Sequence, residues 1–463
     1  MNSYWTTEMV ARALHLPLPE VSYPITFITT DSRQVKPGCL FVAIKGDTHD
    51  GHEFIEQAIS QGAAAILSER ESVFPGGTVF KVASTLHSIR TLAHHYRKTF
   101  SIPFIGIVGA VGKTTTKELA ASLFSGKFTR ILKTEGSQNG FLGIPLTLLE
   151  LKREDQIAII EIGIDDIGAM EKHLALVEPT HLILTKNGPE HLHQLKTVDN
   201  AAAEELKAFD YAAKHELPIA LNLSDEYVTD WLKSHRAKLK PAQLKSYSLE
   251  KAKMPDYLGI YHSEHSELTL QHEDFNASFT LPLPGEHHAH NLLAAITLTQ
   301  FFDLSVAELR EGLATFKTAY GRTEIYQLPN SVEVIGDYYN SNPTSLTAAL
   351  VLLAAKKHKP AYHAVLGDML ELGDEEERFH REIAKCLLEL KISHAWLFGE
   401  RMKWLHSELE NHPSIETRHF SSHAALAEAL RSSMMPESQV LVKGSRGMRM
   451  ERILNAILPS SIH

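Results

Sequence analysis

Residues 102–124 read IPFIGIVGAVGKTTTKELAASLF and place a glycine-rich turn between a strand-like run and a helix-like run. Gly109 and Gly112 would let backbone N–H groups converge on an anion, the helix N-terminus would add its positive end, and Lys113 a full charge. The strict phosphate-loop spacing is not met, because Ile107 stands five positions before Gly112. The stretch therefore predicts an α/β domain with a phosphate site, but it leaves open which class of nucleotide-binding protein the site belongs to.

Short apolar runs and helix-length segments alternate along all 463 residues. This alternation predicts an α/β chain of three domains. We expect a small N-terminal α/β module over 1–98, a central P-loop-type domain with a mainly parallel sheet and covering helices over 99–316, and a Rossmann-like α/β domain over 317–463.

The composition is that of an ordinary globular enzyme. A formal net charge of −10, with no run of Lys or Arg to reverse it, argues against a nucleic-acid partner. No stretch reaches the roughly 18 apolar residues of a membrane span, and the N-terminus lacks the apolar core of a signal peptide. Cys39 and Cys386 stand far apart and are expected to be free thiols. We therefore expect a cytoplasmic protein.

Two further candidates follow apolar runs in the central domain. Glu161 ends the run AIIE, and His191 follows LTKNGPE. Ligands of a nucleotide-bound metal often lie at such strand ends, and the hydroxyl of Thr114 is expected to face Mg²⁺. A strand-end Glu is also often merely solvated, and a single His among 27 is often structural, so only a shared sheet edge would favour a site.

Longer motifs carry a resemblance. Residues 109–115 have the form G-x-x-G-K-T-T, and other stretches read TTDSRQVKPGCLFVAIKG, LPGEHHAHNLLAAI, YGRTEI, GDYYNSNPTSLTAAL, AVLGDMLELGDEEERFH and VLVKGSRGMRME. In these motifs the chain resembles the Mur ligases. The resemblance spans all three predicted domains, and the last two stretches point to the family members that add D-alanyl-D-alanine.

The resemblance implies an ATP- and Mg²⁺-dependent amide ligase of peptidoglycan precursor synthesis, working as a monomer on small molecules. A muramyl-tripeptide carboxylate would attack the γ-phosphate of ATP, giving an acyl phosphate and ADP, and the amine of D-alanyl-D-alanine would then displace phosphate. The third residue of the tripeptide stays undetermined.

The resemblance also assigns roles to individual residues. Lys113, His191, Glu205 and Arg322 are the implied catalytic residues. The implied Mg²⁺ ligands are Thr114, Glu161, His191 and Glu205. Nucleotide contacts are assigned to Gly109, Ala110, Val111, Gly112, Lys113, Thr114, Thr115, Asn291 (adenine), Arg322 and Asp337 (ribose). The uridine-nucleotide end is assigned to Ser32 and Arg33, and the incoming dipeptide or the closing interface to Lys443, Ser445 and Arg446. Without the match, Asn291 could be a helix cap, Asp337 a solvated strand end, and residues 31–33 a polar turn.

The central domain also departs from the family pattern. Val111 replaces a small polar residue, and Lys186 replaces Asn. The family has a carbamylated Lys that holds Mg²⁺, but an ungapped alignment puts Glu205 there and Lys207 where a Glu belongs. Glu is the nearest encoded substitute for a carbamate, and Mg²⁺ accepts its oxygens. Glu205 could instead be a solvated residue of an amphipathic helix, and a small alignment shift would favour Glu204.

Three interpretations stay open. The favoured one is a working ligase, because Lys113, Glu161, His191 and Arg322 are all retained. A weakened paralogue that only binds muramyl peptides or nucleotide is the second. The third, another ATP-dependent amide ligase such as a folylpolyglutamate or cyanophycin synthetase, is disfavoured by the N-terminal DSRQVKPGCLFVAIKG stretch.

Overall fold

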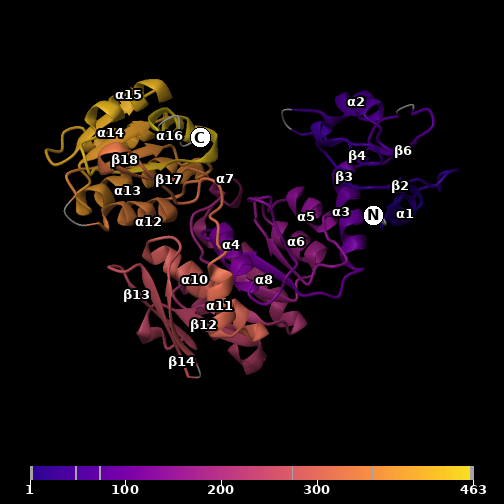
Figure 1. Ribbon diagram of the computed structural model, residues 1–463, viewed down its shortest axis with the longest axis horizontal. Helices are drawn as coiled ribbons and strands as arrows, with labels where there is room; N and C mark the ends of the chain where they lie inside the picture. Colours follow the sequence, from indigo (N-terminus) through magenta and orange to yellow (C-terminus); the bar gives the residue numbers. More distant parts are fainter. Residues whose placement is uncertain (1–3, 47–48, 72–73, 274, 357–358, 459–463) are drawn as a thin grey trace. The chain divides into compact units, whose positions relative to one another are not determined.

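The computed structural model describes residues 4–46, 49–71, 74–273, 275–356 and 359–458, and Figure 1 traces the chain. Its contacts define two compact units. The first comprises 1–106, 130–162 and 171–180, and the second 107–129, 163–170 and 181–463. These units divide the predicted central domain internally, so the boundaries after 98 and 316 remain predictions.

The N-terminal part of the first unit is a small α/β module. Its four described strands pair in parallel in the order β3-β4-β5-β6. Apolar side chains such as Phe41 and Ile66 form its core. The elements are β1 (Trp5–Thr6), α1 (Thr7–Ala13), β2 (Pro24–Ile25), β3 (Ile28–Thr29), β4 (Leu40–Val42), α2 (Ile55–Ser60), β5 (Ala65–Ser68), β6 (Thr78–Lys81) and α3 (Thr85–Arg97). The predicted module is confirmed.

The same unit continues into part of the predicted central domain. The buried guanidinium of Arg97, at the end of α3, donates to the carbonyls of Val177 (2.6 Å) and Glu178 (2.7 Å) and lies 3.6 Å from the ring centroid of Phe104. The side chain therefore joins α3 to the C-terminal end of α6. The elements here are β8 (Ile131–Lys133), α5 (Gly143–Leu149), β9 (Ile157–Glu161) and α6 (Ala169–Val177), and β8 pairs with β9 in parallel.

Strands β10 to β15 of the second unit are neighbours in chain order. They run parallel as far as β13, while β14 and β15 are antiparallel, an extension that the sequence analysis did not predict. The strands are β10 (His181–Leu184), β11 (Ile219–Asn222), β12 (Leu244–Ser248), β13 (Tyr257–His262), β14 (Glu267–His272) and β15 (Phe275–Thr280). Strand β7 (Phe104–Val108), which leads into the glycine loop, is divided between the two units after Gly106. The helices are α4 (Lys113–Phe124), α7 (Leu192–Leu195), α8 (Val198–His215), α9 (Glu226–His235), α10 (Glu286–Thr299) and α11 (Val306–Leu313).

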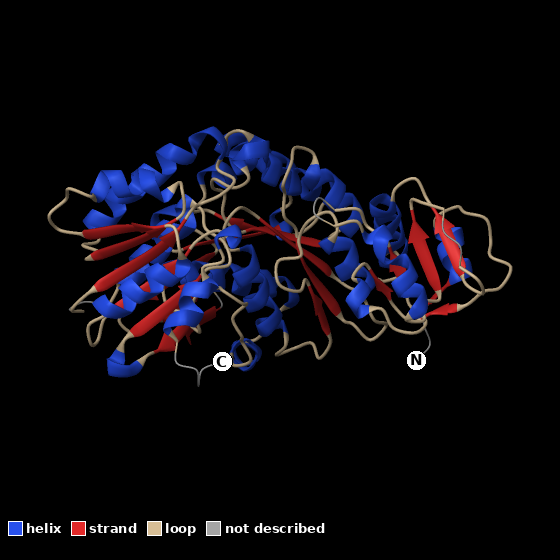
Figure 2. Cartoon of the chain, turned by 90° about the horizontal axis from the view of Figure 1, so that it is seen from above, coloured by secondary structure: helices blue, strands red, loops and turns tan. Residues whose placement is uncertain are grey.

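The C-terminal sheet has six described strands in the order β16-β17-β21-β18-β19-β20, and only β16 is antiparallel to its neighbour. Helices cover both of its faces, with α12 and α13 on one side and α15 and α16 on the other (Figures 1 and 2). The predicted open α/β sheet is confirmed. Its elements are β16 (Glu324–Gln327), β17 (Glu333–Asp337), α12 (Pro343–Ala354), β18 (Tyr362–Gly367), α13 (Glu376–Glu389), β19 (His394–Phe398), α14 (Met402–Leu409), β20 (Glu416–Phe420), α15 (His423–Ser433), β21 (Gln439–Lys443) and α16 (Glu451–Ile457).

Candidate functional site

The glycine loop requires its two glycines. Gly109 has φ +118° and Gly112 has φ +88°, and a Cβ at either position would lie 2.5 Å from a neighbouring side-chain oxygen, Thr185 Oγ1 or Asn291 Oδ1. Asn291 lies within α10 rather than at its start, so the helix-cap interpretation is wrong. Its side chain packs against the loop, next to the start of α4.

Three loop amides donate to acceptors of the protein itself. The amide of Gly109 donates to Glu205 Oε2 (2.8 Å), and those of Ala110 and Val111 donate to the carbonyl of Lys186 (2.8 and 3.2 Å). These bonds fix the glycine loop directly before the N-terminus of α4, the end of the helix that favours an anion. Since Lys186 acts through its backbone carbonyl, its departure from the family residue does not affect these bonds.

Lys113 is the first residue of α4, and its side chain is buried. Its ammonium donates to the carbonyl of Gly109 and lies 3.0 Å from Glu190 Oε2. Glu190 was not predicted, although it directly precedes His191 in the sequence. A negatively charged partner for the loop lysine is thus built into the fold.

Two adjacent carboxylates of α8 hold two different loops. Glu205 is 1% exposed, so the solvated-helix interpretation is wrong. Its Oε1 has no hydrogen-bond partner among the described residues, and burial raises its pKa to about 7. Glu204 accepts from the amides of Gly168 (2.9 Å) and Met170 (3.0 Å) and pairs with Lys207 (2.8 Å). Glu204 therefore anchors the N-terminal end of α6, and Glu205 anchors the glycine loop.

Glu161 ends β9 in the first unit and is 1% exposed. Its Oε1 accepts from Asn139 Nδ2 (2.8 Å), and its backbone amide donates to Thr134 Oγ1 (3.0 Å). Asn139, which the family motif retains, thus orients this carboxylate, and the interpretation of Glu161 as a solvated strand end is wrong.

His191 precedes α7 with φ +51° and lies between two carboxylates. Its Nδ1 is 2.6 Å from Glu371 Oε2, and its Nε2 is 3.8 Å from Glu190 Oε1. Burial opposes protonation, but the hydrogen bond to Glu371 and the charges of both carboxylates outweigh it and raise the pKa of His191. Sequence reasoning missed Glu371, because it lies 180 positions further along the chain.

Residues predicted for different ligands meet at the end of β17. The ammonium of Lys443, 1% exposed, lies 2.5 Å from Asp337 Oδ2 and 2.9 Å from the carbonyl of Asn340. Burial opposes ionisation of Asp337, but Lys443 holds its pKa below the ordinary value. The guanidinium of Arg322 lies 4.7 Å from the ring centroid of Tyr339. Asp337 is therefore an ion-pair partner, and the solvated strand-end interpretation is wrong.

Ser445 and Arg446 differ in exposure. Ser445 is buried, and its hydroxyl accepts from the amide of Leu370 (2.9 Å) and donates to the carbonyl of Ser341 (3.2 Å). Arg446 is half-exposed and pairs with Glu451 at 3.0 Å. Ser445 thus joins three loops of the C-terminal sheet, while Arg446 can reach a ligand.

The N-terminal candidates form a local turn. Asp31 Oδ1 accepts from the backbone amide of Arg33 (2.9 Å), and the Asp31 carboxylate also pairs with its guanidinium (2.7 Å). Ser32 begins the 3₁₀ helix Ser32–Gln34. The side chain of Arg33 is 86% exposed, so it is accessible to a ligand.

The side chains predicted to bind Mg²⁺ include the oxygen donors that this ion prefers. Glu205 offers a buried carboxylate oxygen without a hydrogen-bond partner in the described chain, and Thr114 offers a buried hydroxyl. Within the same residues, no group of three or more His, Cys, Asp and Glu side chains forms a metal site by itself. The ligand set of Thr114, Glu161, His191 and Glu205 remains a prediction.

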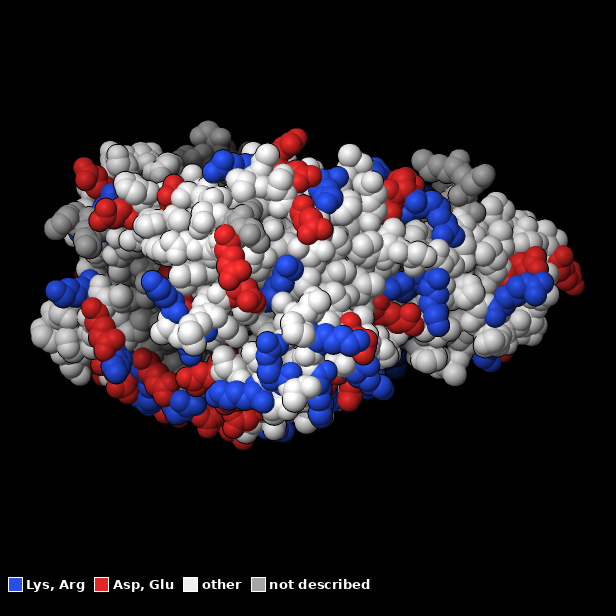
Figure 3. Space-filling view, turned by 90° about the horizontal axis from the view of Figure 1, so that it is seen from below, with Lys and Arg blue, Asp and Glu red and all other residues white. Residues whose placement is uncertain are grey.

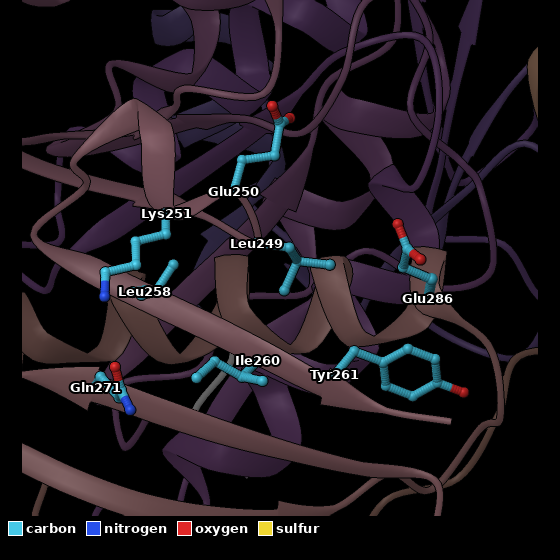
Figure 4. A pocket seen from close by; sticks show the side chains of 8 residues that line it. All are labelled: Leu249, Glu250, Lys251, Leu258, Ile260, Tyr261, Gln271 and Glu286. Atoms are coloured by element: carbon cyan, nitrogen blue, oxygen red, sulfur yellow. The ribbon is translucent and has the colours of Figure 1, made fainter. Parts of the chain in front are cut away.

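An open pocket of about 420 Å³ lies elsewhere, beside β13 and the start of α10 (Figure 4). None of the predicted residues lines it; its lining residues are Leu249, Glu250, Lys251, Leu258, Ile260, Tyr261, Gln271 and Glu286. Acidic and basic side chains are interspersed on the face shown in Figure 3. Among the described residues, no helix has the length and apolarity to span a bilayer.

Comparison with known proteins identifies the family. The descriptions "Mur ligase family, catalytic domain", "Mur ligase middle domain" and "Mur ligase, glutamate ligase domain" match residues 24–97, 107–299 and 321–446. The chain is similar to three relatives, each called UDP-N-acetylmuramoyl-tripeptide–D-alanyl-D-alanine ligase. It is 32% identical to that of Synechocystis sp. (95% of this chain, 94% of the relative), 31% to that of Escherichia coli (93% of each) and 28% to that of Bacillus subtilis (98% of each).

Solved structures of MurF have the same fold as this chain. The crystal structure of MurF from Acinetobacter baumannii superposes with a TM-score of 0.85 at 25% identity over 98% of each chain. The MurF ligase of Thermotoga maritima, solved in complex with ADP, has a TM-score of 0.78 at 24% identity and covers 93% of this chain and 96% of its own. The predicted three-domain α/β fold is confirmed. The chain belongs to the Mur ligase family.

Proposed function

We propose that this protein is an ATP-dependent ligase that adds D-alanyl-D-alanine to UDP-N-acetylmuramoyl-tripeptide in peptidoglycan precursor synthesis. One observation carries the proposal: relatives of that name align with more than nine-tenths of this chain at 28–32% identity. The retained Lys113, at the start of α4, supports a working enzyme rather than a paralogue that only binds. The third residue of the tripeptide is not part of the proposal.

ATP is the proposed nucleotide. The amides at the start of α4 and the ammonium of Lys113 would face its phosphates, and Asn291, which packs against Gly112, would lie close by. Thr114, Glu161, His191 and Glu205 are the proposed Mg²⁺ ligands. Bound Mg²⁺ would offset charge on the phosphoryl oxygens.

The chemistry needs positioning and positive charge more than covalent help. The tripeptide carboxylate attacks the γ-phosphorus and the bond to the β,γ-bridging oxygen breaks, which releases ADP. The amine of the dipeptide then attacks the acyl carbon and phosphate leaves. In this scheme Lys113 and Arg322 stabilise charge on the transferring group.

Different residues are proposed to contact the uridine nucleotide and the incoming dipeptide. Arg33 is exposed and is the proposed contact of the uridine nucleotide, with Ser32 beside it. Arg446 is the proposed contact for the dipeptide carboxylate, since it is half-exposed, whereas Lys443 and Ser445 are buried and bond to neighbouring residues. ATP and uridine-linked precursors place the proposed reaction in the cytoplasm. The monomeric state remains a prediction.

Phosphate release tests this function. ATP and Mg²⁺ are supplied with UDP-muramyl-tripeptide, with D-alanyl-D-alanine, or with both. We expect release that requires both substrates and is matched by amide product on mass analysis, and L-alanyl-L-alanine serves as the matched control. Nucleotide or muramyl-peptide binding without phosphate release would identify a binding paralogue instead.

A further inference from the structure

We propose that Glu371, in the loop after β18, is a positioning residue that orients His191 for metal binding. The inference rests on the proposed function, because His191 is one of the Mg²⁺ ligands proposed there. Both residues belong to the second compact unit.

The hydrogen bond between the two side chains determines which ring nitrogen of His191 carries the proton. His191 Nδ1 lies 2.6 Å from Glu371 Oε2, so Nδ1 carries the proton that the carboxylate accepts. Nε2 is 3.8 Å from Glu190 Oε1, which is beyond hydrogen-bond distance. Metal-binding histidines commonly donate one ring N–H to a carboxylate, which fixes the tautomer and presents the other nitrogen to the metal.

The backbone around this bond is held in an unusual conformation on both sides. His191 has φ +51° and Glu371 φ +66°, which non-glycine residues rarely adopt. Gly373 has φ +60°, and a Cβ there would lie 2.9 Å from the carbonyl of Leu192. The amide of His193 also donates to the carbonyl of Glu371 (3.3 Å). The two segments therefore pack backbone against backbone.

Stability alone does not account for this arrangement. The side chain of Glu371 is 60% exposed, and ion pairs with exposed partners contribute little to stability. Left-handed conformations of non-glycine residues cost free energy and concentrate at functional sites. Because Glu371 follows a strand of the C-terminal sheet and His191 follows β10, the bond makes the orientation of a proposed ligand depend on the C-terminal loop.

Metal binding provides the test. The full chain is saturated with a non-hydrolysable ATP analogue and titrated with Mn²⁺, and free Mn²⁺ is followed by electron paramagnetic resonance. We expect Glu371→Ala to weaken Mn²⁺ binding about 10- to 100-fold, and Glu371→Gln, whose amide oxygen can still accept the bond, to weaken it less. Glu377→Gln is the matched control, because Glu377 pairs with Arg381 on the exposed face of α13; it should bind Mn²⁺ like the wild type.

The imidazole can also be observed directly, without a variant. Long-range ¹H–¹⁵N correlations of ¹⁵N-histidine-labelled protein with the ATP analogue and Mg²⁺ should place the His191 proton on Nδ1. A proton on Nε2, or equal Mn²⁺ affinities of wild type and Glu371→Ala, would overturn the proposal. In the His191→Ala background, Glu371→Ala should cause no further loss of Mn²⁺ affinity. Failure of the proposed function would show separately, as absence of amide product from the wild type.

Discussion

Two ion pairs of this protein use residues assigned to ligands, yet they are built in opposite ways. Lys443 and Asp337 lie 106 positions apart and pair at 2.5 Å, with the side chain of Lys443 almost fully buried. Arg33 and Asp31 are two positions apart and pair at 2.7 Å, with the guanidinium 86% exposed. The first pair joins two strands of a sheet, and the second stays within a single turn.

The difference separates residues that shape a site from residues that can leave their partner for a ligand. A buried charge that loses its partner is strongly destabilising, so Lys443 cannot readily turn to a substrate. An exposed pair contributes little to stability, and Arg33 can exchange Asp31 for a phosphate at low cost. Substitution of a buried charged residue should therefore mainly lower stability, whereas substitution of an exposed one should mainly lower ligand affinity.

The largest effect is expected at the buried pair. Lys443→Met would leave the carboxylate of Asp337 buried without its partner, and we expect a loss of about 3–5 kcal/mol in the free energy of unfolding. Denaturant titration measures it. Arg446→Met, three residues further along the chain, is the control and should change stability by less than about 0.5 kcal/mol. A similar small change for Lys443→Met would remove the contrast between the two pairs.

Lys113 is buried, and its ammonium is also predicted to contact the phosphates of ATP. Lys113→Ala removes the charge that would meet the transferring phosphoryl group, and we expect turnover to fall on the order of 10²-fold or more with the fold intact. Steady-state phosphate release and circular dichroism report the two properties. Unchanged turnover would show that the glycine loop is not the catalytic phosphate site.

Glu205 tests whether a buried carboxylate replaces the carbamylated lysine of the family. Glu205→Gln keeps the shape and an acceptor for the Gly109 amide but loses the charge. We expect turnover to fall on the order of 10²-fold and the Mg²⁺ requirement to rise, with wild-type activity indifferent to bicarbonate. Wild-type kinetics in the variant would leave Glu205 as an anchor of the loop and nothing more.

The same residue should make stability depend on pH. The pKa of Glu205 is raised from 4.5 to about 7 in the folded protein, so the folded state binds the proton more tightly than the unfolded state. Stability should therefore fall as pH rises from about 4.5 to about 7, by roughly 1–3 kcal/mol, and Glu205→Gln should reduce this decline. Urea titrations at pH 5 and pH 8 measure the free energy of unfolding at each pH. An equal decline between the two pH values for wild type and variant would contradict the raised pKa.

Local patterns in the sequence predicted much of the fold. The run FIGIVG, the loop glycines and the helical run TTKELAASLF follow directly from apolar spacing and turn chemistry, and they occur as predicted, with the helix beginning two residues earlier at Lys113. The antiparallel strands β14 and β15 were missed, because the predicted alternation of strands and helices named no strand-like run between residues 257 and 280, where β13, β14 and β15 occur. Hairpins of this kind depend on pairing with neighbouring strands more than on composition.

The site was less predictable, for a physical reason. Glu190 and Glu371 act by lying next to Lys113 and His191 in space, and glutamates are common on solvated surfaces, so neither carries a distinctive sequence signal. Glu205 was found only through the family motif, and its burial and its bond to Gly109 depend on how α8 packs.

The smallest effect on stability is expected at the exposed turn. Arg33→Ala removes a guanidinium whose partner is two residues away, so the free energy of unfolding should change by less than about 0.5 kcal/mol. If Arg33 contacts the uridine nucleotide, affinity for UDP-muramyl-tripeptide should fall about tenfold while ATP affinity stays the same, since one lost charged contact is worth about 1.4 kcal/mol or more. Calorimetric titration of each ligand measures both. Arg12→Ala, which breaks the exposed pair with Glu8 in α1, is the matched control and should alter neither affinity. Equal losses for both ligands would mean that Arg33 supports the module rather than the pocket, and the contrast with Lys443 would then not hold.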